Sequence, residues 1–405
     1  MPTRTSPQVP VAERVNRFSY AIRNIVAEAK AEEARGVNVR YLNIGDPVAF
    51  GFRTPDHLVE ACTQAMRDGH NGYLPSAGIL AAREAVAADY SNRGVPMSPD
   101  RCVITTGTSE AIELCLNALV NEGEEVLIPS PTYPLYTAVL AKIGAQARYY
   151  RKDPRRNWMP DLDHLRSLVT ARTRVLVVID PNNPTGAVYP TAVRRALIEF
   201  AERHDLAIVA DEVYGDIAFD GAVPLMGTLD RDAPIISLSS LSKAYLAPGW
   251  RAGWLVVGAT PRLDAALAAI RKLADGRLCA PGPMQYAIAA ALTGDRSHQV
   301  VFRAALRERG QITADMLNAI PGVHCVAPHA AFYVLPSVTL PPGHTDEQFV
   351  LALLRETGIL CVHGSGFGMP AEQGFLRIVF LANPDDLTRI YRDFAAFTSD
   401  YLARA

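Results

Sequence analysis

The sequence predicts an α/β fold with two domains: a large domain built on a mostly parallel sheet, and a smaller α+β domain after it. From about residue 100, short β-rich runs alternate with longer helical ones, which is the order of βα units. The β-rich runs are continuously apolar, as expected for parallel strands covered by helices on both faces. After about residue 295 the pattern changes to one long charged helix followed by short strands.

Six strands of the large domain can be read from the sequence. The first, residues 101–105, is followed by a glycine turn and a helix that continues through Asn117. The same βα pattern then recurs. The other five predicted strands are the runs EEVLIP, TRVLVVID, LAIVADE, PIISLSS and RAGWLVVG.

The two ends of the chain are predicted to pack together. The helix VFRAALRERGQITADMLNAI leads into the short strands VHCV, AFYVLP, LCVHG and FLRIVF. Near the N-terminus one amphipathic helix, Phe18 to about Arg35, is too little to fold alone. We therefore predict an N-terminal segment, 1–52, that packs with the small domain, a large domain over 53–295 and a small C-terminal domain over 296–405.

Composition and charge argue against several classes of protein. The chain has 405 residues, of which 49% are hydrophobic and 20% charged, as in ordinary globular proteins. Lys and Arg number 40 against 42 for Asp and Glu, so no net charge favours nucleic acid. The N-terminus lacks an apolar signal segment and no apolar run is long enough for a membrane span, so we expect a cytoplasmic protein. The six scattered cysteines lack zinc-ligand spacing; we expect no metal and a reducing compartment.

The segment SLSSLSKAYLAPGWRAGW, residues 237–254, carries the most chemical information. A strand runs into a serine-rich turn that holds one lysine, Lys243, and Arg251 follows eight residues later. A lysine amine can attack an aldehyde, while hydroxyls and an arginine bind phosphate. These residues point to pyridoxal phosphate (PLP), with Lys243 forming the Schiff base and Ser240 and Arg251 on the phosphate. Because an isolated S-x-S-K is usually an exposed loop lysine, this hypothesis needs support from other segments.

Two strand ends supply that support. PNNPTG follows the strand TRVLVVID and places Asn183 at the carboxyl end of the sheet, where open α/β folds bind ligands. LAIVADEVYGD ends a strand with Asp211, and Tyr214 follows three residues later. Asp211 fits the anion that the pyridinium nitrogen of PLP needs, and Tyr214 and Asn183 can hydrogen-bond its phenolic oxygen. Taken alone, these motifs are more often a simple turn and a helix cap.

Two further turns fit the same ligand. TTGTSEAI places Gly107, Thr108 and Ser109 at a helix N-terminus, where free N–H groups attract phosphate, although an ordinary N-cap has the same pattern. PTYPLY supplies Tyr133, an aromatic side chain that can stack on the PLP ring or only pack within its loop.

The order of these motifs resembles one family. The segments GTS, PTYP, PNNPTG, ADEVY, SLSK and GWR follow one another as in the fold-type-I PLP aminotransferases, the class I/II family. The resemblance extends from about Val15 to the end and includes NIGDP, residues 43–47, and FLRIVF, residues 375–380. It implies a mostly parallel seven-stranded sheet in the large domain, a small α+β domain, an obligate homodimer and a ping-pong transamination.

The resemblance also implies roles for individual residues. Lys243 would move the proton between the substrate Cα and the cofactor in addition to binding the cofactor. Arg377, in FLRIVF, would hold the substrate α-carboxylate with help from Asn183 and the backbone at Gly45. Tyr73, in HNGYLPSAG, would reach across the dimer interface to the phosphate of the neighbouring subunit.

A narrower resemblance concerns the alanine aminotransferases of bacteria and archaea. It rests on SYAIRNIV, LNIGDPVAFGF, GHNGY, RLCAPGPMQYAI and HGSGFG, and it implies alanine and 2-oxoglutarate as substrates. Tyr20 and Arg23 would then lie over the substrate, with Arg23 pairing with the distal carboxylate of glutamate. One departure is Ala330, where the family usually has glycine, so we expect this backbone to approach the substrate less closely.

Other functions remain open at this stage. The amino donor could instead be valine, an aromatic amino acid or a pathway-specific intermediate. A C–S lyase or a cyclopropane-forming synthase would use the same lysine and aspartate. A ligand-sensing domain of a transcription regulator is not expected, because it would need an N-terminal helix-turn-helix of about 60 residues and NIGDP already begins at Asn43.

Overall fold

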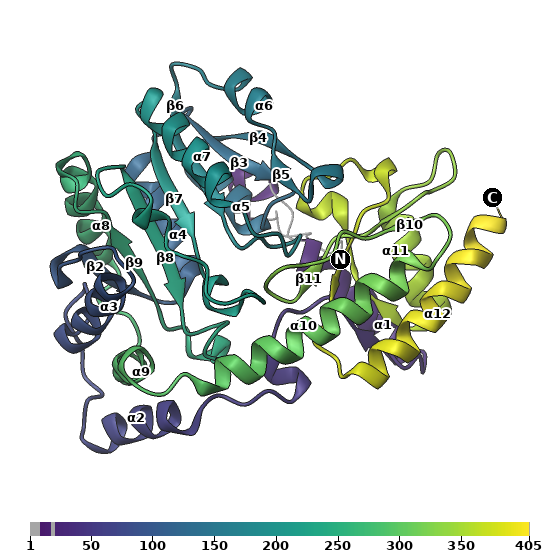
Figure 1. Ribbon diagram of the computed structural model, residues 1–405, viewed down its shortest axis with the longest axis horizontal. Helices are drawn as coiled ribbons and strands as arrows, with labels where there is room; N and C mark the ends of the chain where they lie inside the picture. The colour runs from purple at the N-terminus through teal and green to yellow at the C-terminus, as the bar shows by residue number, and fades with distance from the viewer. Residues whose placement is uncertain (1–8, 18–20, 405) are drawn as a thin grey trace, which may run out of the picture.

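The computed structural model describes residues 9–17 and 21–404. They form a large α/β part around one central sheet and a smaller part built from the C-terminal elements. Helix α10 (Ser297–Asn318) runs from one part to the other (Figure 1). The α/β class expected from the sequence is confirmed.

The central sheet is mixed but mostly parallel. Six of its eight strands point in one direction, and the other two, β9 and β5, pair antiparallel with their neighbours. In order across the sheet, the strands are β2 (Cys102–Thr105), β9 (Gly253–Val257), β8 (Ile235–Ser240), β7 (Ala207–Asp211), β6 (Thr173–Ile179), β3 (Glu125–Ser130), β4 (Gln146–Asp153) and β5 (Met159–Pro160).

The six strands read from the sequence are confirmed, and the implied number of seven is one too few. The two strands that were not read from the sequence are β4 and β5. Of these, β5 lies at the edge of the sheet and consists of two residues that pair with the end of β4. The chain reverses before it at Asn157 and Trp158, which both have positive φ values, 52° and 61°. A two-residue strand that contains a proline has no sequence pattern, and an edge position tolerates it because no inner hydrogen bond is lost.

Helices cover both faces of the sheet, as its continuous apolar strands require. Side chains alternate between the faces along each strand. Val126 and Ile128 pack toward one helical layer, and Leu127, between them, packs toward the other. The first layer consists of α4 (Thr108–Leu119), α5 (Pro134–Ile143) and α8 (Asp264–Gly276), and the second of α6 (Leu162–Ser167) and α7 (Thr191–Arg203).

A third apolar cluster connects the sheet to the smaller part. Ile104 and Trp254, on β2 and β9, pack against a group of helices below that end of the sheet. The cluster continues through Phe302 and Leu306 of α10 into the C-terminal elements. The helices at the sheet end are α2 (Asp56–Arg67), α3 (Leu80–Asn92) and α9 (Gly282–Thr293).

The smaller part contains short sheets and four helices. The three-stranded sheet has the order β11 (Tyr333–Val334), β15 (Leu376–Val379), β14 (Val362–His363), and two-stranded sheets are formed by β10 (Val323–His324) with β12 (Ser337–Val338) and by β1 (Arg40–Tyr41) with β13 (Ile359–Leu360). The helices are α1 (Ala21–Ala34), α10, α11 (Asp346–Thr357) and α12 (Pro384–Ala403). A capping box at Thr345 and an N-cap at Asn383 satisfy the free N–H groups at the starts of α11 and α12.

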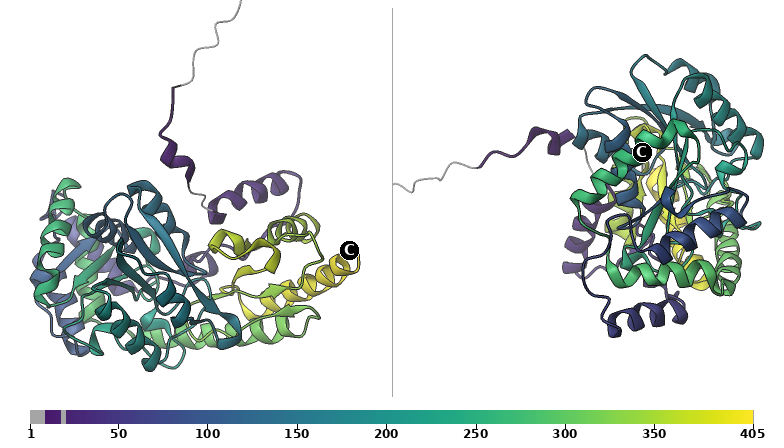
Figure 2. Two further views of the ribbon diagram at one scale, coloured as in Figure 1. Left: turned by 90° about the horizontal axis from the view of Figure 1, so that it is seen from above. Right: turned by 90° about the vertical axis from the view of Figure 1, so that its left-hand side faces the viewer.

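The N-terminal segment packs on the C-terminal elements. Parallel pairing of β1 with β13 is extended by a hydrogen bond of 2.9 Å from the Val379 amide to the Leu42 carbonyl. The Arg40 side chain also pairs with Asp393 on α12. In Figure 2, α1 lies over the same C-terminal elements. The division of the chain at residues 52 and 295 stays a prediction.

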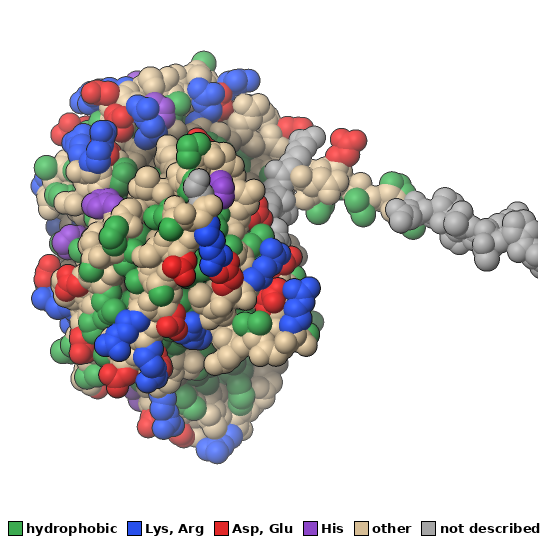
Figure 3. All heavy atoms as spheres, turned by 90° about the vertical axis from the view of Figure 1, so that its right-hand side faces the viewer, with side chains coloured by type: hydrophobic (Ala, Val, Ile, Leu, Met, Phe, Trp, Pro, Cys, Tyr) green, Lys and Arg blue, Asp and Glu red, His purple; other side chains and the backbone are tan. Residues whose placement is uncertain are grey.

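The mixed surface charge and the length and polarity of the described helices agree with the composition. On the face shown in Figure 3, lysine and arginine side chains are interspersed with aspartate and glutamate. Within residues 9–17 and 21–404, none of the helices is both long and apolar enough to cross a membrane.

Candidate active site

A cavity of about 240 Å³ lies at the carboxyl ends of the central strands. It collects nearly all of the side chains that the sequence singled out. The predicted residues that line it are Gly45, Thr108, Ser109, Tyr133, Asn183, Asp211, Tyr214, Ser240, Lys243, Arg251 and Arg377.

The parallel register of the sheet explains why distant motifs meet here. Ile179 at the end of β6 pairs with Asp211 at the end of β7, and Asp211 pairs with Leu238 on β8. Parallel strands in register end at the same edge, so the turns that follow them converge. This places Asn183, after β6, and Ser240, at the end of β8, on either side of Asp211.

Lys243 lies in the turn after β8 with its amine inside the cavity. Its Nζ donates to the Gly45 carbonyl at 2.8 Å and lies 5.4 Å from the centre of the Phe332 ring. Burial lowers the pKa of Lys243 to about 8, against the opposing effect of the nearby Asp46 carboxylate. About a tenth of this amine is therefore unprotonated at pH 7, far more than for an exposed lysine, and the unprotonated form is the one that attacks a carbonyl.

Asp211 is held by a partner that the sequence reading missed. The Tyr136 hydroxyl, on α5, donates to its Oδ2 at 3.1 Å, and the Val213 amide donates to its Oδ1 at 3.4 Å. Burial raises the pKa of Asp211 to about 6, while these two hydrogen bonds act in the opposite direction. A protonated pyridine nitrogen beside this carboxylate would favour its charged form. Tyr136 belongs to PTYPLY, where it reads only as an apolar helix residue.

The start of α4 and Arg251 form a site suited to phosphate. Gly107, the N-cap, has φ 74°, a backbone conformation that favours glycine. An added Cβ would also collide with the Arg251 guanidinium, so the available space requires glycine as well. The Thr108 Oγ1 is buried and has no hydrogen-bond partner among the described residues. Arg251 is held by the carbonyls of Pro248 and Thr106. An orphaned hydroxyl, free helix N–H groups and a fixed guanidinium fit the phosphate of PLP.

Arg377 occupies the opposite side of the cavity. It is 2% exposed, donates to the Asn183 Oδ1 at 3.5 Å and also bonds the Asn43 carbonyl. The Tyr333 and Phe367 rings lie 4.9 and 4.8 Å from its guanidinium carbon. Two flanking rings fix the plane of the guanidinium and favour bidentate contact with a carboxylate. Neither ring was predicted, because aromatic residues in AFYVLP and HGSGFG read as core.

Some predicted residues do not reach the cavity. Tyr73 lies in the connection between α2 and α3, 85% exposed and outside the cavity lining. Ala330 bridges to Ala218 and does not line the cavity, so the expectation that it holds the backbone away from the substrate has no structural support. Tyr20 and the side chain of Arg23 lie outside the described residues.

The family model for aminotransferase class I and II matches residues 38–391. The chain belongs to the class I and II aminotransferases. It is therefore a PLP-dependent enzyme whose substrates are amino acids and 2-oxo acids. The fold-type-I architecture inferred from the motifs is confirmed.

This aminotransferase is similar to several known proteins over nearly its whole length. It is 37% identical to the glutamate-pyruvate aminotransferase AlaA of Haemophilus influenzae, over 97% of this chain and 98% of that one. It is 39% identical to an alanine aminotransferase of Mycobacterium tuberculosis, over 94% and 91%. The solved alanine aminotransferase of Pyrococcus furiosus superposes with a TM-score of 0.93 at 36% identity, covering 96% of this aminotransferase and 100% of that chain.

Proposed function

We propose that this aminotransferase moves the amino group between L-alanine and 2-oxoglutarate by a ping-pong mechanism. The observation that carries an aminotransferase site is the meeting of Lys243, Asp211 and Arg377 in one cavity. The choice of alanine rests on the relatives named alanine or glutamate-pyruvate aminotransferase.

Each side of the cavity has a distinct task in this proposal. The start of α4, with Gly107, Thr108 and Ser109, binds the phosphate together with Ser240 and Arg251. When PLP is bound, its ring supplies an electron sink for the bonds at the substrate Cα.

In this proposal, the residues around the cofactor ring control the protonation of its pyridine nitrogen and the charge on its phenolic oxygen. Asp211 would hold the pyridine nitrogen in its protonated form, supported by the Tyr136 hydroxyl. Tyr214 and Asn183 would donate to the phenolic oxygen, and Tyr133 would pack on the ring. Lys243, held by the Gly45 carbonyl before the cofactor binds, would take the proton from the substrate Cα and deliver it to the C4′ carbon of the cofactor.

The substrate side recognises the α-carboxylate. Arg377, with its plane fixed by two rings, makes the bidentate contact, assisted by Asn183 and by the backbone at Gly45. Position 23 lies one helical turn before Val26 on α1, and Val26 lines the cavity. The resemblance to the alanine aminotransferases leads us to assign Arg23 to the distal carboxylate of glutamate and Tyr20 to the cover of the substrate.

The assembly and location complete the proposal. We propose a homodimer in which the exposed Tyr73 of each subunit completes the phosphate site of the other. An exposed aromatic side chain in a connection is suited to such a contact. We propose a cytoplasmic location, and no nucleic acid or membrane as partner.

A donor panel tests the assignment of alanine. The holoenzyme is mixed with single L-amino acids, and conversion of the cofactor to its amino form is followed by absorbance. We expect alanine and glutamate to convert it fastest. Faster conversion by valine or an aromatic amino acid would contradict the alanine assignment. Release of a thiol together with pyruvate and ammonia from a cysteine conjugate would indicate a C–S lyase.

The same assay tests Arg23. Arg23→Ala should raise the KM for glutamate about tenfold and leave the KM for alanine within about twofold, because only glutamate has a second carboxylate. An equal rise for both donors would rule out this role.

A further inference from the structure

We propose that Tyr333 is a positioning residue that connects the ring side of the site with its carboxylate side. Its hydroxyl orients Tyr214, and its ring orients Arg377. The inference rests on the proposed roles of Tyr214 and Arg377 and adds to them a residue that touches both.

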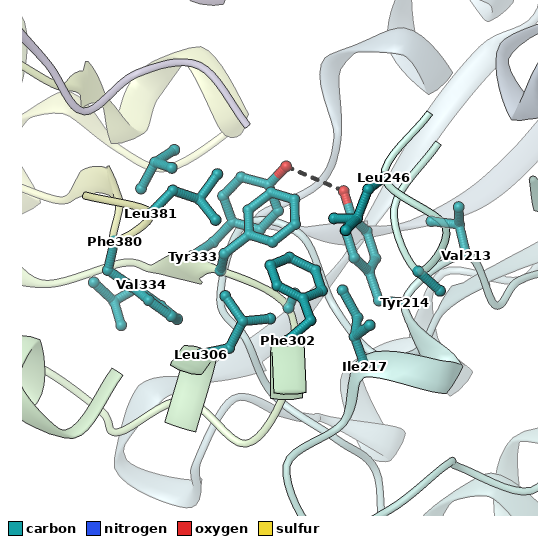
Figure 4. Close-up of a cluster of buried hydrophobic side chains, with 14 of the residues drawn as sticks. Val213, Tyr214, Ile217, Leu246, Phe302, Leu306, Tyr333, Val334, Phe380 and Leu381 are labelled. Atoms are coloured by element: carbon teal, nitrogen blue, oxygen red, sulfur yellow. Dashed lines mark hydrogen bonds between the residues drawn. The ribbon is translucent and has the colours of Figure 1, made fainter. Parts of the chain in front are cut away.

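The hydroxyl contact is direct and buried. The Tyr333 and Tyr214 side-chain oxygens lie 3.2 Å apart, and the rings meet edge to face with centres 5.8 Å apart. The residues are 2% and 4% exposed, so water does not compete for this hydrogen bond. Figure 4 shows the two hydroxyls pointing toward one another from opposite sides of the apolar cluster. The pair therefore connects the turn after β7 of the large part, which holds Tyr214, with β11 of the smaller part, which holds Tyr333.

The ring of Tyr333 faces the substrate arginine. The Arg377 guanidinium carbon lies 4.9 Å from the Tyr333 ring centre and 4.8 Å from the Phe367 ring centre. Gly45 approaches Tyr333 so closely that an added Cβ would collide with the tyrosine hydroxyl. This close approach accounts for glycine at position 45. It adds a third contact that holds Tyr333 in place, besides those with Tyr214 and Arg377.

The directions of the hydrogen bonds follow from the chemistry of the groups. Burial raises the pKa of both tyrosines, that of Tyr333 to about 12, so each hydroxyl keeps its proton at neutral pH. In the protein without cofactor, either hydroxyl can donate to the other. With PLP bound, its negatively charged phenolic oxygen would only accept, so Tyr214 would donate to that oxygen and accept from Tyr333. A hydroxyl that accepts one hydrogen bond becomes a better donor in the next. Tyr333 thereby strengthens the donation by Tyr214.

Several charged or titratable groups surround the pair. Asp211 acts electrostatically on Tyr214, Arg377 on Tyr333, and Tyr133 on both tyrosines. Lys243 lines the same cavity. The substitution Tyr333→Phe replaces none of these groups. It removes one oxygen atom and keeps the ring over Arg377.

The first experiment titrates the holoenzyme from pH 5 to pH 10 and follows the absorbance of the lysine-bound cofactor. Donation by Tyr214 stabilises the unprotonated form, so losing it should raise the midpoint. We expect Tyr333→Phe to raise the midpoint by about 0.5 pH unit, the size of one modest hydrogen bond. Tyr214→Phe should raise it by more, and Tyr333→Phe should add nothing in the Tyr214→Phe background.

The single and double variants distinguish a failure of the role proposed for Tyr214 from a failure of the inference about Tyr333. No shift in Tyr214→Phe overturns the ring assignment of Tyr214, and the inference falls with it. A shift in Tyr214→Phe with none in Tyr333→Phe overturns the inference alone. A Tyr333→Phe shift that persists undiminished in the double variant also overturns it, because the hydroxyl would then act by another route.

The second experiment tests the ring of Tyr333. Binding of propionate, a carboxylate without an amino group, is measured on the holoenzyme. Tyr333→Leu should weaken binding about fivefold through loss of the ring from Arg377, while Tyr333→Phe leaves it unchanged. Equal affinity in the wild type and Tyr333→Leu overturns this half of the proposal.

Tyr391→Phe is the matched control for both experiments. The Tyr391 hydroxyl is also buried, and it hydrogen-bonds the Thr313 hydroxyl at 3.0 Å on α10, outside the cavity lining. Its loss should lower stability by a similar amount but leave the absorbance midpoint and propionate binding unchanged. A shift in this control equal to that of Tyr333→Phe would show a general effect of destabilisation and overturn the specific role.

Discussion

At the scale of single residues, burial has the largest effect on the pKa values of Lys243 and Asp211. Lys243 and Asp211 carry opposite charges, and burial disfavours the charged form of each, lowering the pKa of the amine to about 8 and raising that of the carboxyl to about 6. Both groups therefore titrate near the pH at which such an enzyme works. An exposed lysine would hold its proton until well above pH 10.

The lowered pKa of Lys243 gives a prediction for the cofactor-free protein. Only the unprotonated amine attacks the aldehyde, and its fraction rises tenfold per pH unit until the pKa is reached. The rate of covalent cofactor capture, measured by stopped-flow absorbance, should therefore rise with pH and level off near pH 8. Lys243→Ala should show no covalent capture at any pH. A rate that still climbs steeply between pH 9 and pH 10 would contradict the buried setting of this amine.

At the scale of elements, the ends of β6 and β7 are joined by a buried arginine on α7. The Nε of Arg194 lies 3.1 Å from the Asp180 Oδ2, and its Nη2 lies 3.7 Å from the Glu212 Oε1. Asp180 also accepts from the Tyr189 amide at 2.9 Å, and Glu212 from the Met226 amide at 2.6 Å. One arginine thus ties together the two turns that present the site residues after these strands.

Removing this arginine should leave two buried carboxyls unpaired. We expect Arg194→Met to lower the free energy of unfolding by about 3–5 kcal/mol at pH 8, measured by denaturant titration. Burial already raises the pKa of Asp180 to about 7. A carboxyl with a raised folded pKa binds more protons when folded, so stability falls as pH rises, and the deficit of the variant should shrink toward pH 5.

The control for that measurement is an exposed pair. Arg262 on the surface contacts Glu202 at 2.8 Å, and both side chains are more than a third exposed. Arg262→Met should change the free energy of unfolding by no more than about 0.5 kcal/mol. A deficit below about 1 kcal/mol for Arg194→Met would mean that its buried pairs add little.

At the scale of the whole molecule, the cavity lies where the two parts of the chain meet. Large-part strands supply Asp211 and Ser240, while β15 of the smaller part supplies Arg377 and the N-terminal segment supplies Gly45. A change in how the parts pack would therefore separate cofactor groups from substrate groups. The role proposed for the exposed Tyr73 requires a second copy of the chain.

Subunit mixing tests that contribution. Lys243→Ala and Tyr73→Ala should each be nearly inactive alone. If Tyr73 serves the neighbouring subunit, a mixed dimer contains one intact site, and refolding an equal mixture should restore about a quarter of the wild-type activity. Mixed dimers can be isolated with two different tags. No recovery in isolated mixed dimers would show that Tyr73 does not act across the interface.

The sequence by itself determined the fold class and predicted most of the residues that meet in the candidate site. Continuous apolar strands indicated a covered parallel sheet, and the turns after them held Asn183, Asp211 and Lys243, because ligand groups of such sheets follow strand ends along the chain. Tertiary structure alone decided which side chains support them. Tyr136 reaches Asp211 from α5, and Tyr333 reaches both Tyr214 and Arg377 from a strand far along the chain. Such partners carry no local pattern, because a buried aromatic residue looks the same whether it packs in a core or orients a reactive group.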